Sequence, residues 1–180
     1  MRTFLKTYSL RYLWLLLPLL LLLGWSLNEM YKRQHIAAIS LSAAALVTIV
    51  LHEGYREDAY IPLAGDMATI GFGTTSGVKL GDKITPEKAL QVAMKDVQSY
   101  EGAVKQCVTV PLSQNEYDAY ISLAYNIGTG AFCRSTLVKK LNAGDYVGAC
   151  QQILRWNQFK GKPLAGLTKR RKEEYLKCLG

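Results

Sequence analysis

The residues His52-Glu53-Gly54-Tyr55-Arg56-Glu57-Asp58-Ala59-Tyr60 continue, a few positions later, into Gly65-Asp66-Met67-Ala68-Thr69-Ile70-Gly71-Phe72-Gly73-Thr74. Glu53 ends an apolar run. In the residues that follow, apolar and polar side chains alternate, and glycine is frequent. This pattern predicts a helix that ends at an acid and leads into one small hairpin from Tyr55 to Phe72. We expect Glu53 and nearby polar groups to face a shared cleft.

An acid with further polar groups beside a cleft is what the cleavage of a glycosidic bond requires. One carboxylic acid protonates the leaving oxygen, and a second polar group stabilises the oxocarbenium ion or positions water. Glu53 is the candidate acid, and a solvated charge at a helix end is the alternative explanation for it.

Three separated blocks of sequence carry a resemblance to a known family. They are the segment 53–73, the segment 122–132 with Ser-Leu-Ala-Tyr-Asn-Ile-Gly-Thr-Gly-Ala-Phe, and a pattern from Arg155-Trp156 to Arg170-Arg171 and Glu174. Together they resemble the phage lysozymes of glycoside hydrolase family 24, over roughly residues 50 to 180. Three blocks in the right order are far more specific than any one of them.

The resemblance implies catalytic residues, and one position departs from the family pattern. The family has a Glu, eight residues, an Asp, five residues and a Thr, which Glu53 and Thr69 match with one extra residue between them (69 − 53 = 16). The Asp position falls on Pro62 or Leu63, neither of which is an acid. Asp66 is the nearest substitute, although an Asp after Gly also caps tight turns through its own backbone.

The resemblance therefore implies an endolysin, a muramidase that hydrolyses the β-1,4 bond between N-acetylmuramic acid and N-acetylglucosamine for host lysis. A lytic transglycosylase, or a wall-binding module that lost catalysis with its Asp, remains an alternative. We expect Glu53, Asp66 and Thr69 to be the catalytic residues, without cofactor or metal.

The formal net charge of +8 is concentrated near the C-terminus. A basic face suits an anionic polymer such as peptidoglycan with its acidic peptides. It would equally suit nucleic acid, but no nucleic-acid motif accompanies it. We expect a monomer that binds peptidoglycan.

The N-terminal part holds two apolar runs, from Tyr12 to Leu27 and from Ile36 to Leu51. Each would span about 24 Å as a helix, less than the roughly 30 Å of a bilayer core. The second run is rich in Ala, Ser and Thr, so its insertion should be marginal. It resembles the signal-arrest-release segment of family members that export themselves.

The basic residues Arg2, Lys6 and Arg11 predict a cytoplasmic N-terminus. Two spans would return the catalytic domain to the cytoplasm, so we expect one productive span. Either only the first run stays inserted, or translation starts at Met30 with Lys32 and Arg33 before the second run. The domain would then face the periplasm from the host inner membrane, or be released into it.

The expected organisation is an apolar extension over 1–29, a releasable helix over 30–51 and a catalytic domain over 52–180. An exported domain with an even number of cysteines predicts two disulfides, for which the sequence permits three pairings. We favour Cys107–Cys133 and Cys150–Cys178, because each would join neighbouring helices.

The sequence of the rest of the domain predicts several helices. We expect them to begin at four capping residues: Thr85, Ser113, Ser135 and Asp145. With a single hairpin, the expected class is α+β and lysozyme-like, with a dominant helical lobe after N-terminal apolar helices.

Overall fold

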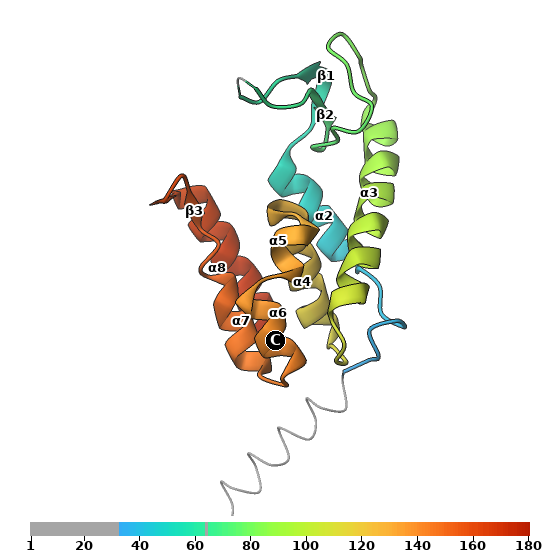
Figure 1. Cartoon of the computed structure of the whole chain (residues 1–180). Coiled ribbons are helices and arrows are strands. Elements are labelled where there is room, and N and C mark those ends of the chain that lie inside the picture. Colours follow the sequence, from blue (N-terminus) through green and yellow to red (C-terminus); the bar gives the residue numbers. More distant parts are fainter. Residues whose placement is uncertain (1–32, 64) are drawn as a thin grey trace, which may run out of the picture. The chain divides into compact units, whose positions relative to one another are not determined.

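The computed structural model describes residues 33–63 and 65–180, and Gln34–Gly180 form one compact unit (Figure 1). The run from Tyr12 to Leu27 and the alternative start at Met30 lie outside the described residues. Within the described ranges, no helix is both long enough and apolar enough to cross a membrane.

Helix α2 (Ala43–Glu53) covers only the later part of the apolar run from Ile36 to Leu51. It begins at Ala43 because the Ser42 hydroxyl caps it, accepting a hydrogen bond from the Ala45 N–H at 3.1 Å. Ser42 is itself held by Asp118, whose carboxylate accepts from the Ser42 N–H at 3.0 Å and from its hydroxyl at 2.6 Å.

The non-helical residues before α2 are bound to the rest of the domain. Gln34 exchanges backbone hydrogen bonds with Leu112, and the Leu41 N–H donates to Glu101 at 2.7 Å. Ile36, Ile39 and, within α2, Ile49 are all less than a tenth exposed. In this structure the segment is therefore part of the domain core.

Strands β1 (Arg56–Tyr60) and β2 (Thr69–Gly71) form the predicted hairpin, pairing antiparallel with Arg56 opposite Gly71 and Tyr60 opposite Thr69. A second, two-residue pairing of β3 (Gln158–Phe159) with β4 (Lys162–Pro163) was not predicted. Its turn has Lys160 at φ 50° and Gly161 at φ 77°.

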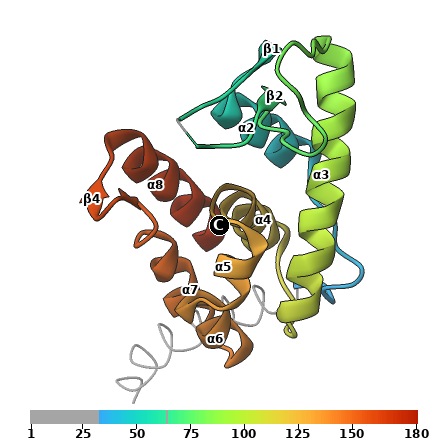
Figure 2. The same cartoon turned by 45° about the horizontal axis from the view of Figure 1, so that its top comes forward.

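The long helix α3 (Pro86–Cys107) connects the hairpin to the helical lobe, as Figure 2 shows. Helix α4 (Gln114–Ile127) follows, and then α5 (Thr129–Cys133), α6 (Thr136–Asn142), α7 (Tyr146–Ile153) and α8 (Ala165–Leu179). All four predicted caps are confirmed, and Ser113 and Glu116 form a complete capping box.

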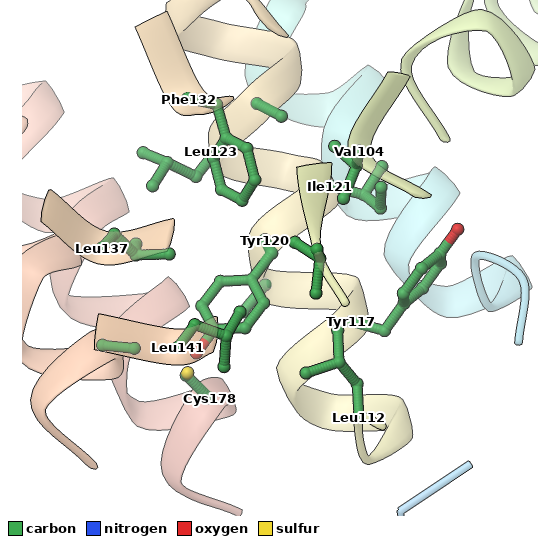
Figure 3. Packing of buried hydrophobic residues seen from close by; sticks show 14 of the residues in the cluster. Val104, Leu112, Tyr117, Tyr120, Ile121, Leu123, Phe132, Leu137, Leu141 and Cys178 are labelled. Carbon is green, nitrogen blue, oxygen red and sulfur yellow. The ribbon is translucent and has the colours of Figure 1, made fainter. Parts of the chain in front are cut away.

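The core surrounds α4, which packs against α2, α3, α5 and α8. Figure 3 shows α4 side chains such as Ile121 and Leu123 among residues of the neighbouring helices. Tyr117, Tyr120, Leu137 and Leu141 are fully buried here, because spacings of three and four residues place each pair on one face of its helix. The predicted α+β class with a dominant helical lobe is confirmed.

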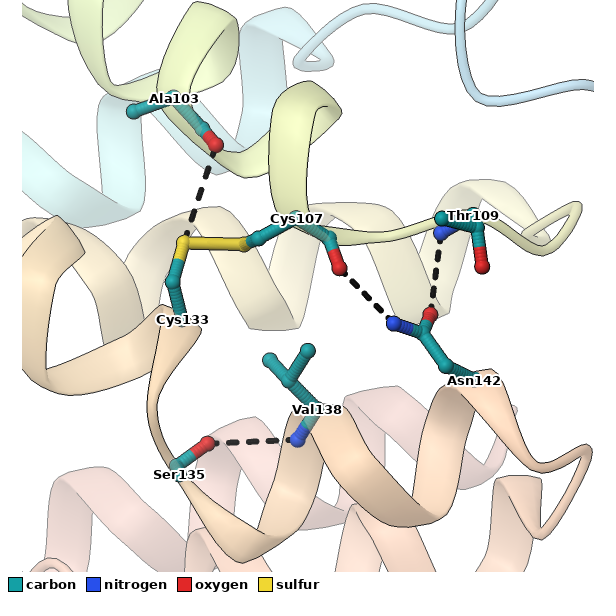
Figure 4. Close-up of a disulfide and its surroundings, with 7 residues drawn as sticks. All are labelled: Ala103, Cys107, Thr109, Cys133, Ser135, Val138 and Asn142. Carbon is teal, nitrogen blue, oxygen red and sulfur yellow. Dashed lines mark hydrogen bonds between the residues drawn. A yellow bond between two sulfur atoms is a disulfide. The ribbon is translucent and has the colours of Figure 1, made fainter.

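Both predicted disulfides are present, Cys107–Cys133 between α3 and α5 and Cys150–Cys178 between α7 and α8. Their Cα atoms lie 5.6 and 5.7 Å apart. Figure 4 shows that Asn142 supports the first one, donating to the Cys107 carbonyl at 2.8 Å and accepting from the Thr109 N–H at 3.0 Å. Cross-links of this span contribute about 3–4 kcal/mol each in the chain-entropy account.

Candidate active site

Glu53 is the last residue of α2, and its carboxylate contacts α8 from the other end of the chain. Gly54, at φ 69°, turns the chain out of the helix with a backbone that few other residues adopt. Glu53 Oε1 accepts a hydrogen bond from Arg170 Nη1 at 2.9 Å, and the side chain is 23% exposed. The candidate acid is thus partly removed from water and held in one orientation.

Arg170 belongs to a network of buried charges between α4 and α8. Its Nε donates to Glu174 Oε1 at 3.2 Å, and the same oxygen accepts from the Ser122 hydroxyl at 2.7 Å and from Arg171 Nη2 at 3.0 Å. Arg171 Nε forms an ion pair with Glu174 Oε2 at 2.8 Å. The three residues from the C-terminal block of the sequence therefore form one unit behind Glu53.

Burial disfavours the charged forms of the side chains in this network. It raises the pKa of Glu174, while Arg171 and the Ser122 hydroxyl act in the opposite direction. It also lowers the pKa of Arg171, whose side chain is fully inaccessible to solvent. Each charge is therefore tolerated only because its partners remain in place.

A tight turn from Ile70 to Thr74 lies against the other oxygen of Glu53. Ile70 and Thr74 exchange backbone hydrogen bonds, and a Cβ on Gly73, which has φ 93°, would lie 3.7 Å from Glu53 Oε2. No hydrogen bond from the described residues reaches Oε2. The turn therefore leaves this oxygen available to a ligand.

Two side chains from the helices hold this turn. The Tyr125 hydroxyl donates to the Phe72 carbonyl at 3.3 Å, and the Thr74 hydroxyl donates to Asp96 Oδ2 at 2.9 Å. Burial raises the pKa of Tyr125, and the charges of Asp96 and Glu53 raise it further. The phenol therefore stays protonated and can keep donating.

Asp96 on α3 is a second carboxylate beside this turn and was not among the predicted residues. Burial, followed by the charges of Asp96 and Glu53, raises the pKa of both Tyr125 and Tyr100. A signal was available, because Asp96 interrupts an α3 face whose buried residues include Ala89, Ala93 and Val97. A polar residue within an apolar helix face often has a specific partner.

The structure places the other predicted site residues on the loop and strand after β1. Asp66 is exposed, and its N–H donates to the Leu63 carbonyl at 2.9 Å in a tight turn. Thr69 is 7% exposed, and its hydroxyl donates to the Met67 carbonyl at 3.1 Å. Neither side chain is bonded to Glu53 among the described residues. Pro62 and Leu63, on one of which the family's Asp position falls, are both exposed.

The remaining charges nearby face outward. Glu57 and Asp58 are exposed, and both lie within 4 Å of Lys83. His52 Nε2 lies 3.5 Å from Glu173, and burial followed by the charge of Arg170 lowers its pKa. Across the described residues no group of three or more His, Cys, Asp or Glu side chains is arranged to hold a metal ion.

Comparison with known proteins agrees with this site. The phage lysozyme family model matches residues 50–174. The endolysin of Acyrthosiphon pisum secondary endosymbiont phage 1 is 44% identical over 138 residues, which cover 74% of this chain and 94% of that protein. The SAR-endolysin of Pseudomonas phage phiKMV is 40% identical over 141 residues, covering 76% of this chain and 87% of that protein.

Solved structures agree as well. The endolysin of Escherichia coli O157:H7 phage FAHEc1 has a TM-score of 0.70 at 39% identity, covering 79% of this chain and 94% of the other. The muramidase domain of SpmX from Asticaccaulis excentricus has a TM-score of 0.73 at 32% identity, covering 78% of this chain and 98% of the other. Since sequence and structure agree over most of both lengths, this chain belongs to the phage lysozyme family and is a peptidoglycan-lysing endolysin.

Proposed function

We propose that Glu53 is the general acid that protonates the glycosidic oxygen between N-acetylmuramic acid and N-acetylglucosamine. The observation that carries this proposal is the pairing of Glu53 Oε1 with Arg170 at 2.9 Å, which leaves Oε2 facing the Gly73 turn. A proton on Oε2 can then be delivered to a leaving oxygen bound beside the turn. Arg170 orients the acid, while Glu174 offsets the positive charge of Arg170.

Analysis of the products tests the reaction itself. Hydrolysis leaves a reducing N-acetylmuramic acid end, whereas a lytic transglycosylase leaves an anhydro end. Mass spectrometry of digested peptidoglycan should therefore show products that have gained one water. A predominance of anhydro ends would contradict hydrolysis.

The group that positions water or stabilises the cation is proposed to be Asp66, together with Thr69. No ion pair or hydrogen bond from the described residues engages the Asp66 carboxylate, so it is available to a ligand. Thr69 begins β2, whose continuing turn contacts Glu53 through Gly73. Asp66 precedes this strand and Thr69 is its first residue, so both lie at the end of β2 opposite the turn at Gly73.

Asp66→Asn should reduce activity strongly, and Thr69→Ala should reduce it comparably or further, because each removes a group that holds water or the cation. A turbidity assay on outer-membrane-permeabilised cells gives the rates. Asp58→Asn, which alters an exposed carboxylate on β1, is the matched control and should be silent. If Asp66→Asn is silent while Thr69→Ala is severe, the Asp66 carboxylate has no part in catalysis and Asp66 only contributes its backbone to the turn.

Tyr125→Phe should lower kcat about three- to tenfold with little change in KM, since losing one hydrogen bond of about 1–1.5 kcal/mol loosens the turn beside Glu53. Tyr117→Phe is a matched control on the same helix, because its hydroxyl donates to Glu101 at 2.7 Å, away from this turn. The control should lower thermal stability but leave kcat unchanged. Equal kcat values for the two variants would contradict a positioning role for Tyr125.

We also propose that the segment from Ile36 to Leu51 is a releasable membrane anchor, so that the domain is held at the host inner membrane and then freed into the periplasm. Similar proteins named SAR-endolysins support this, as does the marginal hydrophobicity of the segment. Ile36, Ile39 and Ile49 lie in the domain core here, as the proposed released form requires. Leaving the bilayer would then complete the core and bring Glu53 to Arg170.

Ala44→Leu combined with Thr48→Leu should delay lysis, because leucine favours insertion and both positions are exposed in the folded domain. Fractionation after the membrane potential is collapsed should find wild type in the periplasm and the variant in the membrane. The same pair changed to serine is the control and should release readily. If the leucine variant lyses on schedule and wild type never leaves the membrane, the segment is a permanent anchor.

A further inference from the structure

The turn from Ile70 to Thr74 lies on one face of α3 and is attached to it at two points. Strand β2, which leads into the turn, packs against α3 (Figure 2). A Cβ on Gly71 would lie only 3.0 Å from the Ala89 Cβ, so the backbone of the turn lies directly on the helix. Asp96 follows seven positions after Ala89 (96 − 89 = 7), about two helical turns, and therefore lies on the same face. There Asp96 Oδ2 accepts a hydrogen bond from the Thr74 hydroxyl at 2.9 Å.

The bond between Thr74 and Asp96 has no competitor among the described residues. Within that part of the chain Asp96 forms no ion pair, and the Thr74 hydroxyl is its only hydrogen-bond partner. Thr74 is 9% exposed, so its hydroxyl needs a partner within the protein. The pair therefore fixes one end of the turn to α3.

The other support of the turn also leads back to α3. Tyr125, whose hydroxyl holds the middle of the turn, packs its ring on Tyr100 with the ring centroids 4.9 Å apart. Tyr100 lies one helical turn after Asp96 on α3. Gly73 lies between the residues held by the two hydroxyls and against Glu53 Oε2. A shift of either support would therefore move the backbone beside the free oxygen of the acid.

We propose that Asp96 is a positioning residue for the cleavage reaction, because by holding Thr74 it fixes the Gly73 turn beside Glu53 Oε2. This rests on the proposed function of Glu53 as the general acid. The turn limits how the leaving oxygen approaches this carboxylate oxygen, so its displacement would misalign the proton transfer. A misplacement of about 1 Å can cost about a hundredfold in rate. In this role Asp96 supplies an acceptor oxygen to Thr74 and does not contact the reacting atoms.

The first measurement removes the Thr74 hydroxyl from the full-length protein. Thr74→Val keeps the shape but loses the donor, so kcat on soluble peptidoglycan strands should fall about ten- to a hundredfold with KM within about twofold of wild type. Thr74→Ser restores the hydroxyl, and its kcat should return to within about threefold of wild type. Thr48→Val is the matched control, because the Thr48 hydroxyl donates to the Ala44 carbonyl at 2.9 Å on the exposed side of α2. Its kcat should be unchanged.

The second measurement separates positioning from chemistry at Asp96. Asp96→Asn keeps an oxygen that can accept from Thr74, so kcat should stay within about threefold of wild type and its pH dependence should keep its shape. Asp96→Ala should match Thr74→Val, and the double variant should lose no more than either single variant, because both remove the same bond. An equal loss in Asp96→Asn and Asp96→Ala, with an altered pH profile, would overturn the proposal, because Asp96 would then act through its charge.

Thermal unfolding shows whether each variant is folded at the assay temperature. If Thr74→Val or Asp96→Ala is not, the pH profile of the milder Asp96→Asn decides between the two roles. Full kcat in folded Thr74→Val would overturn the positioning role. Glu53→Gln in the same assay distinguishes the two proposals: if it is inactive while Thr74→Val is fully active, only the role of Asp96 is wrong. If Glu53→Gln is active, Glu53 is not the acid and both proposals fail.

Discussion

Glu53→Gln should abolish lysis without unfolding the domain. Glutamine is nearly isosteric with glutamate and can still accept the hydrogen bond from Arg170, but its amide cannot deliver a proton. General acid catalysis contributes about 10²–10⁴-fold, so the rate should fall at least about a hundredfold. Zymography beside wild type, with peptidoglycan in the gel, measures the loss at equal protein.

Glu57→Gln provides the control, because Glu57 is exposed four residues further on and only approaches Lys83 at 3.8 Å. It should clear the gel as wild type does. Residual activity of Glu53→Gln above about a tenth of wild type would mean that another group supplies the proton, since general acid catalysis is worth much more than tenfold. Asp96, the other carboxylate near the turn, would then be the residue to change next.

Glu174→Gln should lower the free energy of unfolding by about 3–5 kcal/mol, the usual cost of removing one partner from a buried ion pair. The change leaves Arg170 and Arg171 buried beside each other, with only Glu53 to balance them. Because small domains are stable by about 5–15 kcal/mol, this is a large share of the total. Urea unfolding with both disulfides intact gives the difference.

Glu173→Gln serves as the matched control one residue earlier. Its side chain is 47% exposed and its ion pairs are long, so the free energy of unfolding should change by no more than about 0.5 kcal/mol. If Glu174→Gln and Glu173→Gln lowered the free energy of unfolding equally, the buried network behind Glu53 would contribute no more than a surface ion pair. We also expect Glu174→Gln to reduce activity, because Arg170 loses the partner that holds it.

Features determined by local chemistry could be predicted from the sequence. Thr85, Ser113, Ser135 and Asp145 each cap a helix through contacts three residues away, so residue type and spacing were sufficient. The disulfide pairing followed because it joins adjacent helices. The position of Glu53 at a helix end followed from the glycine after it.

Features determined by contacts between residues far apart in the chain could not be predicted from the sequence. Helix α2 starts at Ala43 because Asp118, 76 positions away from Ser42, holds the cap, and no local pattern encodes that distance. The link from Thr74 to Asp96 likewise spans 22 positions. The β3–β4 hairpin depends on Lys160 adopting a left-handed backbone, where Asn or Gly would have given a clear turn signal.

The docking of the residues before α2 has a practical consequence for anyone preparing recombinant protein. The phage lysozyme family model matches from residue 50, but the compact unit begins at Gln34. A fusion joined at residue 50 would discard Ile36, Ile39 and Ile49 from the core, along with the capped start of the helix that carries the acid. Tags and carrier proteins therefore belong ahead of Gln34, where the chain enters its backbone pairing with Leu112.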